Sequence, residues 1–423
     1  MNEKQCSAVD AFIRRESIFL TGSAGTGKSF TLKEICRVAR TLHLKVGLTA
    51  TSGSAAHLIG GRTLHSFLSI GLAKQSAQTL AAQTRQKYKP TYKSIRALDV
   101  LIIEEISMMD MELFEKVSDY LSLIRENSKP FGGLQVLFIG DFCQLPPVRM
   151  TKFCFKSQIW QQMKMTTIML TESVRHLSDP ILKRVLEMVR WGKCDKATLE
   201  LIKTFGPTAA NPAPEGLIPT RLYPTNVNVD LINDTEIAKL IDQGVASETF
   251  QTTYNGSPTG SRRWAASNKI PENVTLCIGA QVVVTWNVNQ EAGIFNGTRG
   301  IVTALKPLSI QVRNGQTVQI DRITVTDQDS SGGGSGNSGN HHNSISYIPL
   351  RLAYALTIHR CQGMTLDYVE VDLGSSIFEY GQAYTALSRV RDTASMKVLE
   401  VSMSSFRCHP DVIEFYKNIV SIV

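Results

Sequence analysis

The sequence predicts an α/β fold in which helices flank parallel sheets. Short apolar runs at 17–21, 45–50, 100–103 and 136–139 alternate with helix-compatible segments such as 28–42. This alternation is typical of parallel strands joined by crossover helices. Glycine-rich or acidic turns follow several of these runs. Because ligands bind at the carboxyl ends of parallel strands, we expect the functional groups to lie in those turns.

Composition sets broad limits on the class of protein. The 423 residues are enough for about two to four domains. A net charge of +8 suits a polyanionic partner, although ordinary proteins also reach this value. The eight cysteines show no C-x-x-C spacing, which argues against a disulfide framework and against zinc or iron–sulfur ligation. No signal peptide or membrane span is expected, so we anticipate a soluble intracellular protein.

The turn after the first apolar run carries the phosphate-binding pattern G-x-x-x-x-G-K-S. Glycines allow a loop whose backbone N–H groups face a phosphate chain, and the following helix directs its N-terminus at the anion. The lysine then reaches the terminal phosphates, and the serine hydroxyl ligates Mg²⁺. The residues expected to bind nucleotide here are Gly22, Gly25, Thr26, Gly27, Lys28 and Ser29.

Two further strand ends carry polar side chains. The run 100–103 is followed by Glu104 and Glu105, and one carboxylate is expected to hold Mg²⁺ while the other activates a water. A solvated acidic strand end is the alternative. In the segment 138–147, Gln144 can sense a γ-phosphate, and Pro147 belongs to a proline pair that would stiffen a loop beneath a bound strand. This segment taken alone also fits an ordinary turn.

The rest of the chain divides by composition. Residues 71–94 are polar, helix-compatible and free of acidic side chains, so they predict a small insertion. Residues 211–216 predict a connector, and 247–273 an exposed loop. Short β-type runs with Asn-Gly turns at 294–298 and 312–316 predict a small β module over about 298–347. Residues 330–340 predict a flexible loop, either natural or engineered. The α/β pattern returns at 369–373 and 397–401.

An ordered set of motifs resembles the petite integration frequency (PIF) family of superfamily-1 helicases, close to the RecD-type enzymes. The set covers nearly the whole chain, which makes it far more specific than any single motif. It comprises Gln5, Gly22–Ser29, Thr49–Gly53, Thr63–Phe67, Glu104–Met108, Gly140–Pro147, Leu170–Arg175, Thr225-Asn226, Phe295–Gly297, Thr357–Thr365 and Tyr384–Val390.

The resemblance implies two RecA-like P-loop domains with ATP between them. The first would comprise 1–67 and 95–168, interrupted by a wedge insertion at 68–94. The second would comprise 169–297 and 348–423, interrupted by an SH3-like β insertion at 298–347 that contains the loop 330–343.

The resemblance also implies roles for individual residues. Gln5 would read the adenine, Gly363 would contact the nucleotide, and Arg175 and Arg389 would act as arginine fingers, because a planar guanidinium suits a transferring phosphoryl group. Phe67 either stacks on a base or fills a core. The residues implied for single-stranded DNA are Thr51, Thr63, His65, Ser66, Phe67, Pro147, Thr357, His359 and Gln362.

The implied function is a DNA helicase that uses ATP and Mg²⁺, binds single-stranded DNA and single-strand–duplex junctions, and acts as a monomer. Polarity of 5′-to-3′ rests on the resemblance alone, and action on G-quadruplexes or RNA–DNA hybrids stays open, as does a role in DNA replication, repair, recombination or telomere maintenance. Glu104 departs from the aspartate usual in the family, and its extra methylene can weaken Mg²⁺ coordination. An RNA-directed motor and a nucleotide-gated clamp with weak hydrolysis are the alternatives.

Overall fold

The computed structural model divides the chain into two compact units. Unit 1 comprises Met1–Leu217 with Ile358–Val423, and unit 2 comprises Ile218–Thr357. The structure describes residues 1–147, 152–176, 178–208, 219–256, 261–262, 265, 270–286, 288, 294, 298–312, 315–326, 344–366 and 368–420, apart from the side chains of 54, 57–58, 226–228 and 420.

Unit 1 contains a six-stranded parallel sheet. Its strand order is β3-β2-β4-β5-β1-β6, and every described neighbour pair is parallel. The elements of this part are α1 (Glu3–Ile13), β1 (Ile18–Gly22), α2 (Lys28–Thr41), β2 (Val46–Ala50), α3 (Gly53–Leu58), β3 (Arg62–Thr63), α4 (Leu64–Leu68), α5 (Ala77–Lys87), α6 (Lys89–Arg96), β4 (Val100–Glu104), η1 (Ile106–Met108), α7 (Met111–Arg125), η2 (Pro130–Gly133), β5 (Gln135–Ile139), η3 (Cys154–Lys156), α8 (Gln158–Gln162) and β6 (Thr166–Leu170).

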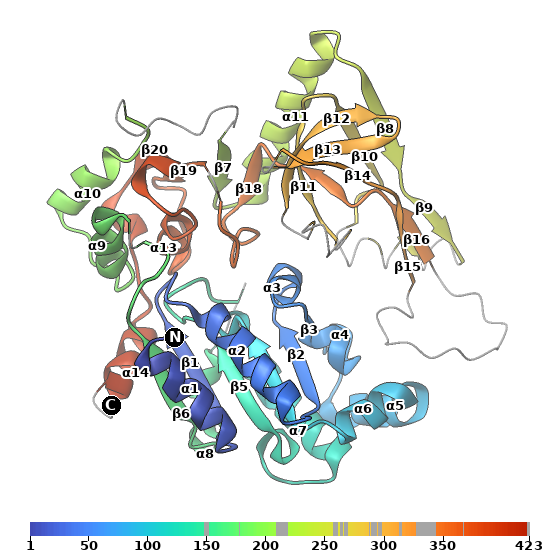
Figure 1. Ribbon diagram of the computed structural model, residues 1–423, viewed down its shortest axis with the longest axis vertical. Helices are drawn as coiled ribbons and strands as arrows, with labels where there is room; N and C mark the ends of the chain where they lie inside the picture. The colour runs from blue at the N-terminus through green and yellow to red at the C-terminus, as the bar shows by residue number, and fades with distance from the viewer. Residues whose placement is uncertain are drawn as a thin grey trace. The chain divides into compact units, whose positions relative to one another are not determined.

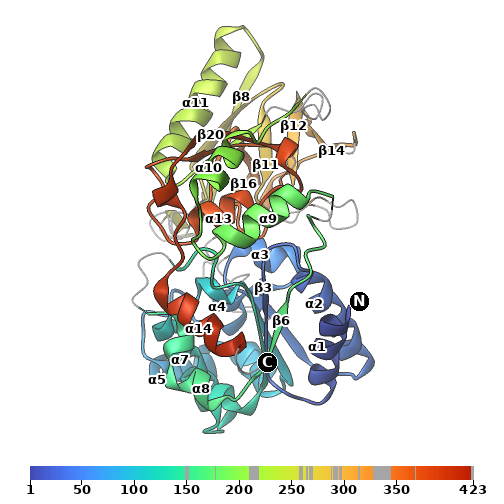
Figure 2. The same ribbon diagram turned by 90° about the vertical axis from the view of Figure 1, so that its left-hand side faces the viewer.

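Helices cover both faces of this sheet (Figures 1 and 2). Ile18 and Leu20 of β1 face a core formed with α1 and α2. Phe19 of the same strand faces the opposite way, toward the rings of Trp160 and Phe415. The central strands are therefore buried on both faces, which explains why they are continuous apolar runs rather than alternating ones.

The remainder of unit 1 is formed by two helices that follow β6 and by the C-terminal part of the chain. Strands β19 and β20 pair in parallel. Helix α14 carries Phe415 into the aromatic core beneath β1. The elements are α9 (Pro180–Val189), α10 (Lys196–Lys203), β19 (Val369–Leu373), α13 (Gln382–Leu387), η5 (Thr393–Ser395), β20 (Met396–Val401), η6 (Met403–Ser405) and α14 (Pro410–Val420).

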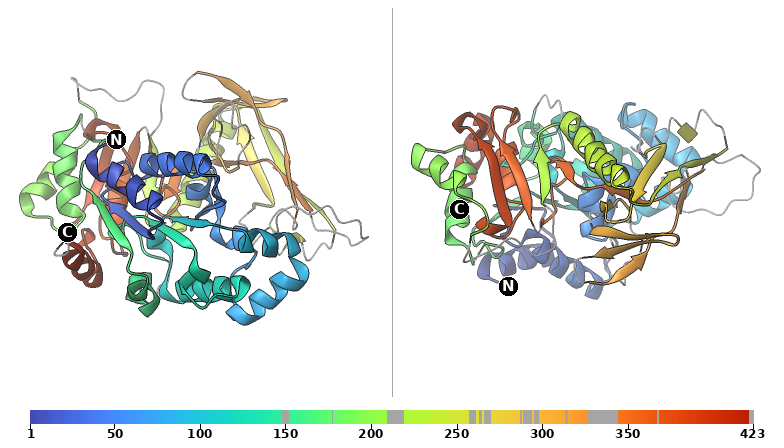
Figure 3. Two further views of the ribbon diagram at one scale, coloured as in Figure 1. Left: turned by 60° about the horizontal axis from the view of Figure 1, so that its bottom comes forward. Right: turned by 90° about the horizontal axis from the view of Figure 1, so that it is seen from above.

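Unit 2 is mostly antiparallel β structure. One sheet has the order β14-β13-β12-β11-β17 and another β15-β16-β9, while β10 pairs with β8 and β18 pairs in parallel with β7. Helix α11 lies along these strands (Figure 3) and adds Ile237 to their core. The elements are β7 (Thr220–Tyr223), α11 (Asn226–Asp242), β8 (Ser247–Gln251), β9 (Thr253–Asn255), β10 (Asn273–Cys277), β11 (Gln281–Val284), β12 (Arg299–Leu305), β13 (Leu308–Val312), β14 (Thr317–Gln319), β15 (Ile323–Thr326), β16 (Ser344–Tyr347), β17 (Leu350–Leu352) and β18 (Ala355–Thr357).

The structure confirms most of the predicted elements of unit 1. Strands β1, β2, β4 and β5 lie within one residue of the predicted runs, and the polar segment before residue 95 forms the helices α5 and α6. The exposed loop predicted over 247–273 is wrong. Strands β8 and β9 occupy part of it, and the half-buried side chains of Phe250 and Tyr254 alternate there with exposed polar residues.

Some predicted features lie outside the described residues. These are the connector at 211–216, the motif Phe295–Gly297 and the loop 330–343. All eight cysteines are free thiols. Within the described residues, no helix combines the length and apolarity needed to cross a membrane.

Candidate nucleotide and strand site

The phosphate-binding loop connects β1 to α2. Gly25 and Gly27 adopt positive φ angles of 81° and 89°. A Cβ atom on Gly27 would approach the amide of Gln5, and one on Gly25 would approach the side chain of Arg175, so both positions also need glycine for lack of space. The Lys28 ammonium donates to the carbonyl oxygens of Gly22 and Ser23 at 2.7 and 3.0 Å. Burial lowers the pKa of Lys28, although three nearby carboxylates oppose this effect.

Gln5 lies beside the loop but uses its amide locally. Its Oε1 accepts from the backbone N–H of Asn2 at 3.0 Å, which completes a capping box at the start of α1. Its Nε2 lies 3.5 Å from the carbonyl oxygen of Thr26. The side chain is 4% exposed. These contacts link α1 to the phosphate-binding loop.

Glu104 and Glu105 follow β4 as a buried pair. Burial, reinforced by the Glu105 carboxylate, raises the pKa of Glu104 well above its usual range, while Lys28 opposes the rise. Glu105 adopts a left-handed backbone conformation with φ 56°, which costs a non-glycine residue about 1–2 kcal/mol. The hydroxyl of Thr51 donates to the Glu105 carbonyl oxygen at 2.8 Å and helps to hold this conformation.

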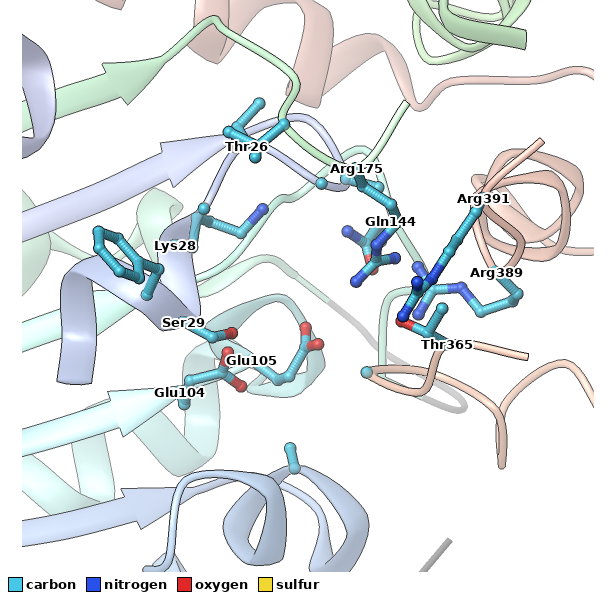
Figure 4. A pocket seen from close by; sticks show the side chains of 17 residues that line it. Thr26, Lys28, Ser29, Glu104, Glu105, Gln144, Arg175, Thr365, Arg389 and Arg391 are labelled. Atoms are coloured by element: carbon cyan, nitrogen blue, oxygen red, sulfur yellow. The ribbon is translucent and has the colours of Figure 1, made fainter. Parts of the chain in front are cut away.

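Arg175, Arg389 and Arg391 line one cavity together with the phosphate-binding loop and the two glutamates (Figure 4). Arg389 is 3% exposed, and its guanidinium already donates to Thr385 O at 2.8 Å and to Ser388 Oγ at 2.6 Å. Arg175 donates to Ser388 O at 3.1 Å. Burial, with Arg389 and Arg391 contributing, lowers the pKa of Arg175 to about 10.

A cavity of about 430 Å³ brings most of the predicted nucleotide residues together. It is lined by Gly25, Thr26, Gly27, Lys28, Ser29, Glu104, Glu105, Gln144, Arg175, Gly363 and Arg389, whereas Gln5 and Gly22 lie outside its lining. Phe30, Ala55 and Arg391 also line the cavity, although they lie outside every motif that carries the resemblance. Arg391 directly follows the motif Tyr384–Val390, so a second basic residue beside Arg389 was the available signal.

Gln144 is buried in the wall of the cavity. It is 5% exposed, and its Oε1 has no hydrogen-bond partner among the described residues. An unpaired buried acceptor is costly, so this amide is well suited to contact a bound molecule.

A buried ion pair beside the cavity was not predicted. The Arg190 guanidinium donates to both carboxylate oxygens of Asp141, at 2.9 and 3.1 Å. The hydroxyls of Tyr384 and Tyr416 each donate to the same carboxylate at 3.2 Å. Tyr384 also accepts from the backbone N–H of Ala24, so the network connects the phosphate-binding loop to α9, α13 and α14.

The residues of the N-terminal part that are predicted to contact single-stranded DNA cluster at the carboxyl ends of β2 and β3. Ala50 pairs with Thr63 across these strands, and the Thr63 hydroxyl caps α4 by accepting from Ser66 N at 3.3 Å. Burial lowers the pKa of His65 in this helix. The half-buried ring of Phe67 lies against the backbone of Gly47 in β2.

The other residues predicted to contact the DNA strand are Pro147 and three residues of the segment 357–362. Pro147 is half-buried, Thr357 lies in unit 2, and His359 lies in unit 1. Gln362 is 2% exposed. Its Nε2 donates to Oε2 of Glu105 at 3.1 Å, so the structure places this amide against the predicted catalytic carboxylate.

Comparisons with known proteins agree with this architecture. The PIF1-like helicase family matches residues 2–190, and the 2B domain of the DNA helicase Pif1 matches residues 265–305. The human ATP-dependent DNA helicase PIF1 is 34% identical over 99% of the chain, which spans 64% of that protein. The ATP-dependent DNA helicase Pif1 of Bdellovibrio bacteriovorus is 33% identical, with 99% of the chain and 92% of the relative covered.

Solved structures show the same fold. The Pif1 helicase from Candida albicans has a TM-score of 0.87 at 32% identity, with 99% of each chain covered. A Bacteroides Pif1 complex with ADP-AlF3 and ssDNA has a TM-score of 0.76 at 23% identity, covering 99% of this chain and 97% of that one. The fold therefore consists of two RecA-like domains with insertions. The chain belongs to the PIF1-like helicase family, and its human and Bdellovibrio relatives are named ATP-dependent DNA helicases.

Proposed function

We propose that the chain is an ATP-driven motor that moves 5′-to-3′ on single-stranded DNA and unwinds duplex DNA at junctions. One observation carries the proposal. A single cavity is lined by the P-loop Lys28, the carboxylate of Glu105 and a set of arginines. Phosphoryl transfer needs this combination, because it depends on positioning and on stabilising charge around the transferred group. A Bacteroides Pif1 of the same fold is known in complex with ADP-AlF3 and ssDNA, which supports a nucleotide and a single DNA strand as the ligands.

Within this proposal, each part of the cavity has its own task. Lys28 and the loop backbone hold the phosphates, while Glu105 orients the attacking water and accepts its proton. Arg175 and Arg389 stabilise charge on the γ-phosphoryl group, and Gln144 senses its presence.

Ser29 and Glu104 are the residues that would hold Mg²⁺. Both line the cavity, and both offer the oxygen ligands that this ion prefers. Glu104 and Glu105 are adjacent, both are buried, and both line the cavity with Ser29, so a cation held there would offset the cost of burying two negative charges. The residues therefore fit the ion, which when bound supplies further neutralisation of the phosphates.

We infer that the single strand passes over the carboxyl ends of β2 and β3, where Thr63, His65 and Ser66 gather. Hydroxyl and imidazole groups suit phosphate and sugar contacts that do not read sequence. We further propose that α5 and α6 form the wedge module and that one copy of the chain suffices for stepping.

Comparing ATPase stimulation by matched DNA and RNA oligomers tests the choice of nucleic acid, because a 2′-hydroxyl contact would favour RNA.

A clamp with weak hydrolysis is the second candidate. The observation that favours it is Glu104, whose longer side chain stands where the family usually has aspartate. A steady-state ATPase assay with Mg²⁺ and single-stranded DNA separates the two functions. Turnover above background supports the motor, and a rate equal to background supports the clamp.

Substituting the P-loop lysine provides the direct test of the motor. Lys28→Ala removes the ammonium that contacts phosphate, so DNA-stimulated ATPase is expected to fall by about a hundredfold or more. Strand binding, measured by fluorescence anisotropy, should persist because it uses other residues. Lys33→Ala, which changes an exposed lysine of the same helix, is the matched control and should retain activity. Full unwinding by Lys28→Ala would contradict the mechanism.

A further inference from the structure

The backbone and the side chain of Glu105 are held by two different donors. Oε2 of its carboxylate accepts from Nε2 of Gln362 at 3.1 Å. Its carbonyl oxygen accepts from the Thr51 hydroxyl at 2.8 Å. Thr51 follows β2 and Gln362 lies more than 300 positions later in the sequence, yet both reach the same residue. Both also belong to the set expected to contact the DNA strand.

The hydrogen-bonding capacity of these two side chains is limited. A threonine hydroxyl has a single proton to donate, and phosphate oxygens of a strand only accept. The Thr51 proton is already used on Glu105. The Gln362 amide has two protons, one directed at Glu105 and the other near Ser107 Oγ at 3.5 Å. Its Oε1 has no partner among the described residues and cannot bind phosphate, because it is also an acceptor.

Strand phosphates and Glu105 therefore require the same donors. A strand contact by Thr51 means giving up the Glu105 carbonyl. Because Gln362 is 2% exposed, its amide reaches a strand only by moving, and that movement breaks its hydrogen bond to the Glu105 carboxylate. Glu105 is sensitive to such a loss, because its left-handed backbone conformation is held by its neighbours. Its carboxylate is 3.1 Å from the Gln362 amide, and the oxygen engaged there is less available to take a proton from water.

We propose that Gln362 and Thr51 restrain Glu105 and that strand binding relieves the restraint by competing for their protons. The proposal rests on the proposed function, since it concerns how DNA stimulates hydrolysis at that site. Gln362 and Thr51 are positioning residues in this scheme. They act on hydrolysis through Glu105, which is the group that faces the attacking water.

The test measures ATPase at saturating ATP with and without saturating single-stranded DNA. Gln362→Met keeps the length and burial of the side chain but removes the donor. Its DNA-free kcat is expected to rise by about tenfold, the factor that one hydrogen bond to a charged group represents. KM for ATP should stay unchanged, and the ratio of DNA-stimulated to DNA-free kcat should fall. Gln362→Ala is the second variant if the methionine side chain prevents folding.

Thr51 and Thr49, two positions apart in the chain, provide a test variant and its matched control. Thr51→Val removes the hydroxyl that holds Glu105 while keeping the shape of the side chain, and should also lower the stimulation ratio. Thr49→Val removes a buried hydroxyl that donates to Ile102 O at 2.6 Å, two residues earlier in the chain and away from Glu105. This control should retain the wild-type ratio.

The alternatives predict different results. If Gln362 only contacts the strand, the DNA concentration for half-maximal stimulation rises while DNA-free kcat stays at the wild-type value, which overturns the proposal. If the residue has only a structural role, the melting temperature and both rates fall together, which also overturns it. Absence of any ATPase in the wild-type protein would instead refute the proposed function, so the two failures are distinguishable.

Discussion

At the level of single residues, the arginines that line the cavity differ in whether their guanidinium groups already donate hydrogen bonds to the protein. The guanidinium of Arg389 is buried and donates to the protein itself. Arg391 is exposed, lines the cavity, and has no hydrogen bond or ion pair within the described part of the chain. Figure 4 shows its side chain extending toward the same region as Arg389 and Gln144. Arg391 is therefore able to reach a phosphate without breaking existing contacts.

This difference leads to a prediction for Arg391. Arg391→Ala should lower DNA-stimulated kcat by about tenfold or more, because it removes a cation beside the transferring phosphoryl group. Arg391→Lys should restore part of the rate, since the charge returns without the planar fork. Arg40→Ala, at an exposed position of α2, is the control. Equal rates for Arg391→Ala and the wild-type protein would show that this side chain contributes nothing to hydrolysis.

Between elements, the buried pair of Asp141 and Arg190 joins the end of β5 to α9 and, through tyrosines, to α13 and α14. Burial alone would raise the pKa of Asp141, but the charge and hydrogen bonds of Arg190 outweigh it and lower that pKa. A carboxyl whose folded pKa is depressed stabilises the fold above its unfolded pKa of 3.8 and loses this contribution as the pH falls through the folded value. The pair should therefore hold these elements together at neutral pH.

Asp141→Asn tests this role. It keeps the shape of the side chain but leaves the Arg190 charge buried without a counter-charge, so unfolding free energy should fall by about 3–5 kcal/mol. Urea denaturation at pH 7 provides the measurement. Asp411→Asn breaks an exposed ion pair with Lys156 and should cost about 1 kcal/mol or less. A similar decrease in unfolding free energy for the two variants would mean that the buried pair contributes no more to stability than an exposed ion pair.

Elements were predictable from the sequence where local pattern and burial agree. Strand β4 is buried along its whole length, so its apolar run marked it to within one residue. Strands β8 and β9 are half-exposed, and their polar composition hid the alternation of Phe250 and Tyr254. The phosphate-binding loop was recognisable because its residues are contiguous.

Contacts between residues far apart in the sequence were not predictable in the same way. Asp141 meets Tyr416 across 275 positions, and Gln362 meets Glu105 across 257. No local spacing encodes such pairs, because they depend on how distant elements of unit 1 pack. Motif resemblance predicts a DNA contact for Gln362, but its hydrogen bond to Glu105 became visible only in the folded chain.

At the level of the whole molecule, the direction of movement is a property of the proposed motor as a whole rather than of single contacts. Contacts to phosphate and sugar are not specific to sequence, so the residues of the strand path do not themselves name a polarity. In the proposed motor, direction depends on which end of the strand points toward the wedge formed by α5 and α6 and on how the two domains close. The chain also spans only 64% of the human relative, so its activity has to be measured on the chain itself.

The expected direction is 5′-to-3′, and tailed duplexes test it. A motor that loads on single-stranded DNA and moves 5′-to-3′ meets the duplex only when the tail carries the free 5′ end. We therefore expect ATP-dependent strand displacement from a 5′-tailed duplex and background displacement from a 3′-tailed duplex of the same sequence. A blunt duplex and Lys28→Ala control for spontaneous melting and for displacement without hydrolysis. Preferential unwinding of the 3′-tailed substrate would reverse the assigned polarity while leaving the motor intact, because loading and hydrolysis use the same site in either direction.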